Sequence, residues 1–139
     1  MPNFIITNTI PKYNSDDLLV ANIDGKKCKT LEKFFISIAQ ELKFPEYFGH
    51  NLDAFDEMIC DLSWLEEEAV IIILKNFEEL LDEEETDEED FKGLIMSLLD
   101  SAADDQKSET EGTPIRIIIK NEKGIKEYLN ENGIEYIHN

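Results

Sequence analysis

The chain has 139 residues and carries 13 basic against 32 acidic side chains, a formal charge of −19 with a pI near 4.3. This charge argues against direct binding to nucleic acid or to an anionic membrane, because both require lysine and arginine. The longest apolar runs, 69–74 and 115–119, are too short to span a bilayer, and the N-terminus lacks the basic start of a signal peptide. We therefore expect one cytoplasmic domain over residues 1–139.

The first half of the chain predicts a strand followed by two helices. The strand is 18–23, an apolar run that ends in a turn. Thr30 is a suitable N-cap for the first helix, in which apolar residues recur at helical spacing: Leu31, Phe34, Phe35, Ile38, Ala39 and Leu42. Pro45 should end this helix, because the residue before a proline is driven out of the helical region. Asn51 is a second N-cap, and helical spacing resumes after it at Leu52, Phe55, Ile59 and Leu62.

The second half predicts two buried strands and several short elements. Residues 69–74 and 115–119 are short, β-branched apolar runs, typical of strands buried on both faces. Between them we expect a short helix over 77–81, a longer one from Phe91 that fades at Ala103, and a polar loop over 104–113. The tail adds a short helix over 125–129 and a strand over 134–137.

The order of these elements predicts an α/β fold. Helices between strands impose parallel pairing through right-handed crossovers. The expected architecture is a three-stranded parallel sheet covered by helices, with an extra C-terminal helix and strand, the strand joining at an edge. The three strands of the sheet are 18–23, 69–74 and 115–119.

The cysteines and histidines do not form a metal-binding pattern. Cys28 and Cys60 are far apart in the sequence, and His50 and His138 are the only two histidines. A zinc site would need all four side chains to converge, whereas zinc ligands normally come in closely spaced pairs. We expect reduced, partly buried thiols, no metal site and no cofactor.

The acidic residues are concentrated in one stretch. Residues 66–90 contain 13 carboxylates and a single lysine, a net charge of −12. Such a stretch is either a solvated helix face with an acidic loop or a field that speeds encounter with a basic partner. Composition alone favours the first. Calcium binding is not predicted, because the stretch lacks the glycine turn of a calcium loop.

No catalytic motif is present in the sequence. Asp53, Asp56 and Glu57 recur at helical spacing and share one face of the second helix. Acid–base catalysis would require one of these carboxylates to be buried with a raised pKa, whereas the apolar side of this helix points elsewhere. We expect no enzyme activity. A small acid-catalysed enzyme is the least favoured of three functions that the sequence allows.

Residues 41–57 strongly resemble the barstar family, the intracellular inhibitors of the ribonuclease barnase. The family pattern there is a helix ending in leucine, then P-E-Y-Y-G-x-N-L-D-A-L-W-D. The residues kept are Pro45, Glu46, Tyr47, Gly49, Asn51, Leu52, Asp53 and Ala54. The likeness extends over about 18–120, leaving 121–139 as a C-terminal extension, and implies a barstar-like fold.

The resemblance implies an inhibitor that inserts a loop and helix into the active site of a basic ribonuclease. Carried over position by position, Tyr47 packs on the catalytic histidine, and Asp53 and Glu57 stand in for RNA phosphates. A later acid falls on Asp100. Gly49 and Asn51 shape the loop, and the family's binding surface also takes in Leu52 and Asp56.

Three departures leave the partner open. The aromatic residue that usually follows the family's second helix falls on Leu62 or, with a shift of two residues, on Trp64. Glu57 replaces an aspartate of the family, which keeps the charge and lengthens the reach, and Asp56 replaces a tryptophan. They imply a target other than barnase itself. The expected role is self-protection or immunity against a nuclease toxin, and the alternative is a non-inhibitory binding module for another basic protein.

Overall fold

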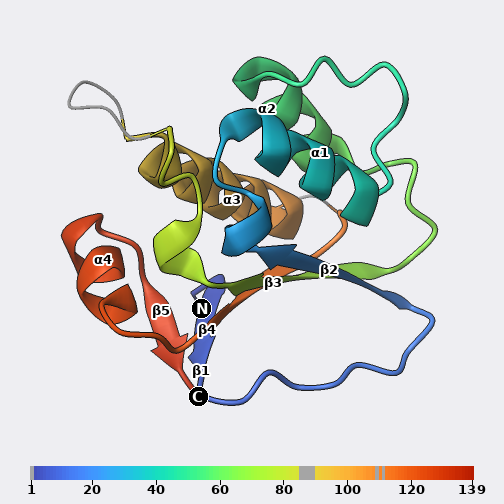
Figure 1. The fold of residues 1–139 in the computed structure, drawn as a ribbon. Coiled ribbons are helices and arrows are strands. Elements are labelled where there is room, and N and C mark those ends of the chain that lie inside the picture. The colour runs from blue at the N-terminus through green and yellow to red at the C-terminus, as the bar shows by residue number, and fades with distance from the viewer. Residues whose placement is uncertain (1, 85–89, 109, 111) are drawn as a thin grey trace.

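A computed structural model describes residues 2–84, 90–108, 110 and 112–139. Five strands form one sheet in the order β2-β3-β4-β1-β5, and every pairing is parallel (Figure 1). The strands are β1 (Phe4–Thr7), β2 (Leu18–Asp24), β3 (Ala69–Lys75), β4 (Ile115–Lys120) and β5 (Tyr136–His138). The predicted parallel pairing of β2, β3 and β4 is therefore confirmed, but the sheet has five strands and not three.

The two additional strands bring both ends of the chain to one side of the sheet. β1 pairs with β4, with Phe4 opposite Ile117, and β5 pairs with β1, with Phe4 opposite Tyr136. The tail strand lies at an edge, as expected, but its neighbour is β1, to which the sequence analysis assigned no structure. A strand of four residues is too short for its alternation to be distinguished from a loop.

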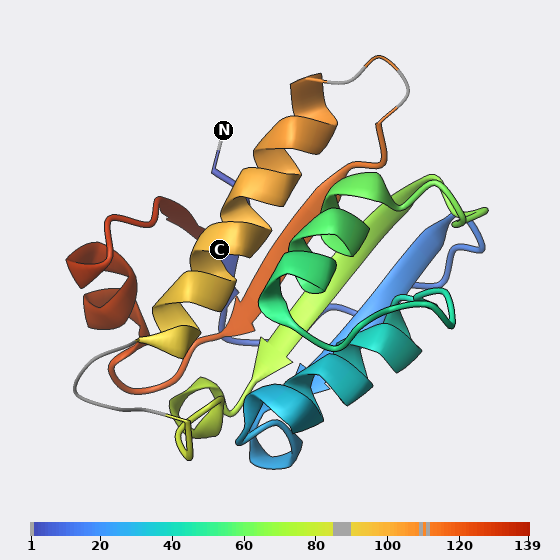
Figure 2. The ribbon, with the colours of Figure 1, turned by 90° about the horizontal axis from the view of Figure 1, so that it is seen from above.

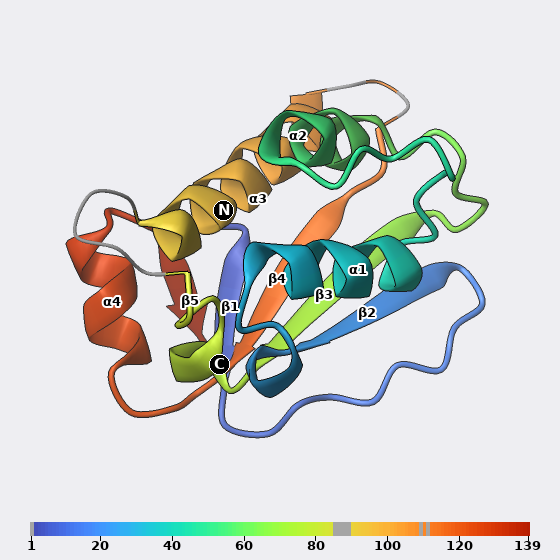
Figure 3. The ribbon, with the colours of Figure 1, turned by 45° about the horizontal axis from the view of Figure 1, so that its top comes forward.

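The helices lie on one face of the sheet (Figures 2 and 3). They are α1 (Leu31–Glu41), α2 (Leu52–Asp61), α3 (Phe91–Ser108) and α4 (Ile125–Glu131), with the 3-10 helices η1 (Gly25–Lys27) and η2 (Phe77–Glu79). Both predicted N-caps are confirmed, since the side chains of Thr30 and Asn51 each accept a backbone hydrogen bond from the first turn of their helix.

Two helix ends and one short helix differ from the sequence prediction. α1 stops at Glu41, before Pro45 can act, because Lys43 takes a left-handed backbone with φ 56°. α3 continues to Ser108, so residues 104–108, which were expected to belong to a polar loop, are helical. The buried Gln106 explains this extension, because its side chain bonds to the backbone of both Cys60 and Thr113. The expected helix over 77–81 is only the 3-10 turn η2.

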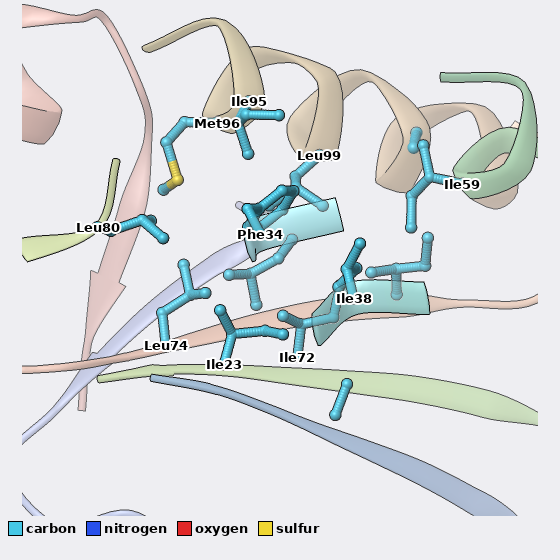
Figure 4. Close-up of a cluster of buried hydrophobic side chains, with 14 of the residues drawn as sticks. Ile23, Phe34, Ile38, Ile59, Ile72, Leu74, Leu80, Ile95, Met96 and Leu99 are labelled. Atoms are coloured by element: carbon cyan, nitrogen blue, oxygen red, sulfur yellow. The ribbon is translucent and has the colours of Figure 1, made fainter. Parts of the chain in front are cut away.

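The main core lies between the sheet and α1–α3 (Figure 4). Ile23, Ile72 and Leu74 rise from the strands to meet residues of the helices, and all are buried. The helical side chains labelled with them are Phe34, Ile38, Ile59, Ile95, Met96 and Leu99. The amphipathic spacing read from the sequence is thus the face that each helix buries.

The opposite face of the sheet has a smaller apolar cluster. Ile71, Ile73 and Ile118 are buried there. The long connection from β1 to β2 runs along this side of the sheet (Figure 1). Ile10 and Tyr13 of this connection pack on the cluster. Burial raises the pKa of the Tyr13 hydroxyl. The connection therefore shields from water a sheet face that none of the described helices covers.

The acidic stretch is described only in part, since 85–89 lie outside the described residues. Asp82 and Glu79 lie 3.7 Å from the ammonium of Lys29, and Glu84 accepts a hydrogen bond from the first amide of α1. The described part of the stretch is thus tied to the start of α1. No helix in the described part of the chain is long and apolar enough to cross a membrane.

Gly25 should tolerate no side chain. A Cβ at this position would collide with the carbonyl oxygen of Asn76 and lie 2.9 Å from the amide nitrogen of Leu80. Both are backbone atoms, which cannot move aside without displacing η2. We expect Gly25→Ala to lower the free energy of unfolding in urea by about 1–3 kcal/mol or more. Lys26→Ala, at the exposed neighbouring position, should change it little, and equal effects would contradict the packing of η1 on η2.

Candidate functional site: an acidic loop and helix

The loop between α1 and α2 is packed from below by aromatic rings. The amide of Phe44 donates to the carbonyl of Ala39, and the amide of Phe48 donates to Pro45 across a tight turn. The rings of Phe44 and Phe48 meet edge to face at 5.0 Å, and the ring of Trp64 lies 5.7 Å from that of Phe44. These contacts fix the loop on the core and leave Tyr47 as an exposed aromatic side chain, 72% accessible.

Trp64 also closes the end of α1. Its indole nitrogen donates to the carbonyl of Leu42, which has no partner within the helix. The neighbouring aliphatic residue, Leu62, is fully buried and ends α2 in a left-handed conformation with φ 57°. The segment after α2 therefore packs against the loop and against the end of α1.

Asn51 connects the loop to the helix. Its Oδ1 accepts from the amide of Ala54 at 2.8 Å, and its Nδ2 donates to the carbonyl of Gly49 at 3.3 Å. One side chain thus caps α2 and holds the preceding turn. Gly49 fits closely against this side chain, since a Cβ on Gly49 would lie 3.2 Å from Nδ2 of Asn51.

α2 presents its acids on the side away from the core. Phe55 is buried, whereas Asp53 and Glu57 are exposed and follow each other by one helical turn. Side chains at this spacing have Cβ atoms about 5–6 Å apart, so the two carboxylates form one negative surface. Asp56 and Leu52 are half-buried beside it.

Asp56 points toward α3. Its Oδ1 accepts from the thiol of Cys60 at 3.6 Å, and that thiol also lies 3.7 Å from Oδ2 of Asp105 on α3. Gln106 completes this seam by donating to the carbonyl of Cys60 at 2.8 Å. Burial together with the negative charges of Asp56 and Asp105 raises the pKa of Cys60 to about 11. Both cysteines are free thiols.

Asp100 lies on a different side of α3. The side-chain nitrogen Nδ2 of Asn3 donates to the carboxylate of Asp100 at 2.8 Å and to that of Asp104 at 2.9 Å, so these two acids face the start of β1. The side of α3 that meets α2 carries Asp105 and Gln106. The structure brings seven of the predicted site residues together on the loop and α2 and leaves Asp100 apart from them. Those seven are Tyr47, Gly49, Asn51, Leu52, Asp53, Asp56 and Glu57.

Asp105 is a surface acid that sequence reasoning missed. It lies in the segment expected to be a loop, so no helical face could be assigned to it. The extension of α3 to Ser108 places it beside α2, where it is exposed.

The surface carries uncompensated negative charge. Among the described residues, no ion pair joins Asp53, Asp56 or Glu57 to a cation, and the nearby ammonium of Lys43 is 2.7 Å from Glu67. The hydrogen bond from Lys43 is the main reason that the pKa of the Glu67 carboxyl is lowered. Within the described ranges, no three histidine, cysteine or acidic side chains gather closely enough to hold a metal ion. The arrangement is chemically suited to binding positive groups.

The thiol of Cys60 should react slowly with alkylating agents. Thiolate is the reactive form, and a pKa of about 11 leaves about two orders of magnitude less of it than in an ordinary exposed cysteine. Asp105→Asn removes one negative charge and should lower this pKa, so alkylation near pH 8 should be faster. Mass spectrometry of peptides separates Cys60 from the buried Cys28, whose rate should not change. An unchanged rate at Cys60 would contradict the contact between α2 and α3.

Comparison with known proteins identifies the family of this chain. The family model described as Barstar (barnase inhibitor) matches residues 18–120, which includes β2, β3, β4 and α1–α3. A curated protein of Bacillus subtilis (strain 168), named "Putative ribonuclease inhibitor YrdF", is 36% identical over 56 residues. That alignment covers 40% of this chain and 58% of the relative, so the chain spans little more than half of it. The family match covers well over half of the chain, and the chain therefore belongs to the barstar family.

Proposed function

We propose that this protein inhibits a ribonuclease by binding to its active site with the loop over 44–51 and helix α2. The observation that carries the proposal is the combination on one rigid segment of an exposed Tyr47 with acids that have no cation partner in the described structure. Family membership and the name of the curated relative support the same conclusion. The role that follows is protection of a cell from its own nuclease or from a delivered nuclease toxin.

The chemistry of inhibition is substitution of carboxylates for phosphates. A ribonuclease binds the RNA backbone with arginine, lysine and histidine, and the carboxylates of Asp53 and Glu57 offer these groups comparable charge. A pair of acids one turn apart can engage two cationic groups at once, with charge-assisted hydrogen bonds. Tyr47 adds a flat aromatic surface beside them, and aromatic residues are frequent anchors of tight interfaces.

The rigidity of the loop favours tight binding. Loops that become ordered on association lose conformational entropy, which subtracts from the affinity. Here the rings of Phe44 and Phe48, the cap of Asn51 and the indole of Trp64 hold the loop in the free protein. The free energy gained from contacts with the partner is then reduced less by ordering of the loop.

The alternative is a binding module of the same family for a basic protein that is not a nuclease. Asp56 is the observation that favours it. This residue replaces an aromatic contact of the family, and its carboxylate is engaged with Cys60 at the seam with α3. A basic partner of different shape would be accommodated by such a surface.

An inhibition assay separates the two functions. The purified chain would be mixed with a panel of small basic bacterial ribonucleases, including barnase, and cleavage of a fluorogenic RNA followed. We expect one enzyme of the panel to be inhibited at an equimolar ratio. Binding without inhibition would favour the module, and neither binding nor inhibition across the panel would overturn the proposal.

Glu57→Ala should weaken binding to the inhibited ribonuclease by about 30-fold or more. Removing one member of a buried charge pair costs about 2–5 kcal/mol, because the partner's cations are left desolvated and unpaired, and 1.4 kcal/mol corresponds to tenfold in affinity. The change should appear mainly as faster dissociation in surface plasmon resonance. Stability should be nearly unchanged, since Glu57 is exposed in the free protein.

Two matched variants control for charge alone. Glu131→Ala removes an exposed acid from α4 and should alter neither rate constant strongly. Neutralising Asp82, Glu83 and Asp90 together should slow association modestly and leave dissociation as it is. If Glu57→Ala and these controls have equal, small effects, the interface lies elsewhere on this protein.

Association should also slow as salt is added. A chain of charge −19 attracts a basic enzyme over distances comparable to the Debye length, about 8–10 Å at physiological ionic strength. Stopped-flow association rates between low and high salt would measure this effect. A flat dependence would mean that the acidic surface does not steer the encounter.

A further inference from the structure

His50 occupies an unusual place in the loop. It lies between Tyr47 and Asp53, directly before the N-cap Asn51, and its side chain is exposed. Its backbone is left-handed, with φ 52°, a region in which asparagine, aspartate and histidine are enriched and which most other residues with a Cβ avoid. A histidine at this point places a titratable side chain inside a surface that otherwise carries carboxylates.

One ring nitrogen of His50 is committed to the protein itself. Nδ1 lies 3.0 Å from the carbonyl oxygen of Phe48, and the two rings are 4.7 Å apart. A carbonyl only accepts hydrogen bonds, so Nδ1 must carry a hydrogen in the neutral ring as well as in the charged one. The neutral ring therefore has its lone pair on Nε2, the nitrogen that this bond leaves for an outside partner.

His50 is surrounded by charged groups of both signs. Its groove is lined by Lys43 and Glu46 from the loop, whereas α1 contributes the neutral side chains of Ile36, Ala39 and Gln40. Lys43 is paired with Glu67, and Asp53 follows in the first turn of α2. A bound ribonuclease would bring cations to Asp53 and Glu57, and therefore into the neighbourhood of His50.

Resting on the proposed function, we propose that His50 contacts the ribonuclease directly and makes inhibition dependent on pH. The neutral imidazole accepts a hydrogen bond from the ribonuclease through Nε2. The imidazolium has no acceptor and adds a positive charge beside the cations of the enzyme. Binding therefore releases one proton from His50 and weakens as the pH falls through the range in which histidines titrate, between about pH 5 and 8.

The test compares the wild-type chain with His50→Asn against the ribonuclease inhibited in the panel assay. Asparagine suits the left-handed backbone and stays neutral, and the ratio of the two affinities cancels the titration of the enzyme's own groups. Release of one proton changes a dissociation constant by at most tenfold per pH unit. We expect wild-type binding to lose about tenfold relative to His50→Asn between about pH 7.5 and 5.5.

Two further measurements keep the result unambiguous. His138→Asn removes the other histidine, on β5 at the sheet edge, and should leave the pH dependence of the wild type unchanged. Nitrogen-15 NMR of the free protein should show the Nδ1-protonated tautomer for neutral His50, a readout that needs no partner.

The outcomes separate this inference from the proposed function. Equal pH dependence in wild type and His50→Asn, or the opposite tautomer, would overturn the role of His50 while inhibition stands. If no ribonuclease of the panel is bound by either chain at any pH, the proposed function fails, and the role of His50 fails with it.

Discussion

The parallel pairing of β2 with β3 is the constraint on which the candidate surface depends. Leu18 lies opposite Ala69 and Asp24 opposite Lys75, so the chain leaves the carboxyl end of β2 and must return to the amino end of β3. Everything between these strands is one crossover connection, made of η1, α1, the loop and α2. The proposed binding segment is thus a connection anchored at both ends by a continuous ladder of hydrogen bonds.

Within that connection, apolar packing and charge are separated by residue position. The side chains of Phe48 and Phe55 point into the core and meet the ring of Phe35, at 5.9 Å and 6.0 Å. Their sequence neighbours Tyr47, Asp53 and Glu57 are left on the outside. The same burial that stabilises the fold therefore orients the side chains proposed to bind, and the Asn51 cap and the Trp64 indole add to it.

Local chemistry explains which features the sequence predicts well. Caps and amphipathic spacing depend on residues within one or two turns, which is why α1, α2 and the acids of α2 were predicted. The position of Asp100 depends on Asn3, and that of Asp105 on Cys60, contacts between residues far apart in the chain. The resemblance to the family points to the loop and α2, because eight residues of the family motif are kept there. It gave no comparable guide on α3, whose match is loose.

The insertion of β1 between β4 and β5 has a consequence for the order in which the protein folds. Phe4 has Ile117 on one side and Tyr136 on the other, so β1 finds its neighbours only after more than 100 further residues have been synthesised. Contacts of such long sequence separation require closure of large loops and form slowly. The crossover that carries the loop and α2 has both of its strands much earlier in synthesis. The proposed inhibitory segment can therefore assemble on β2 and β3 while β1 still awaits its place in the sheet.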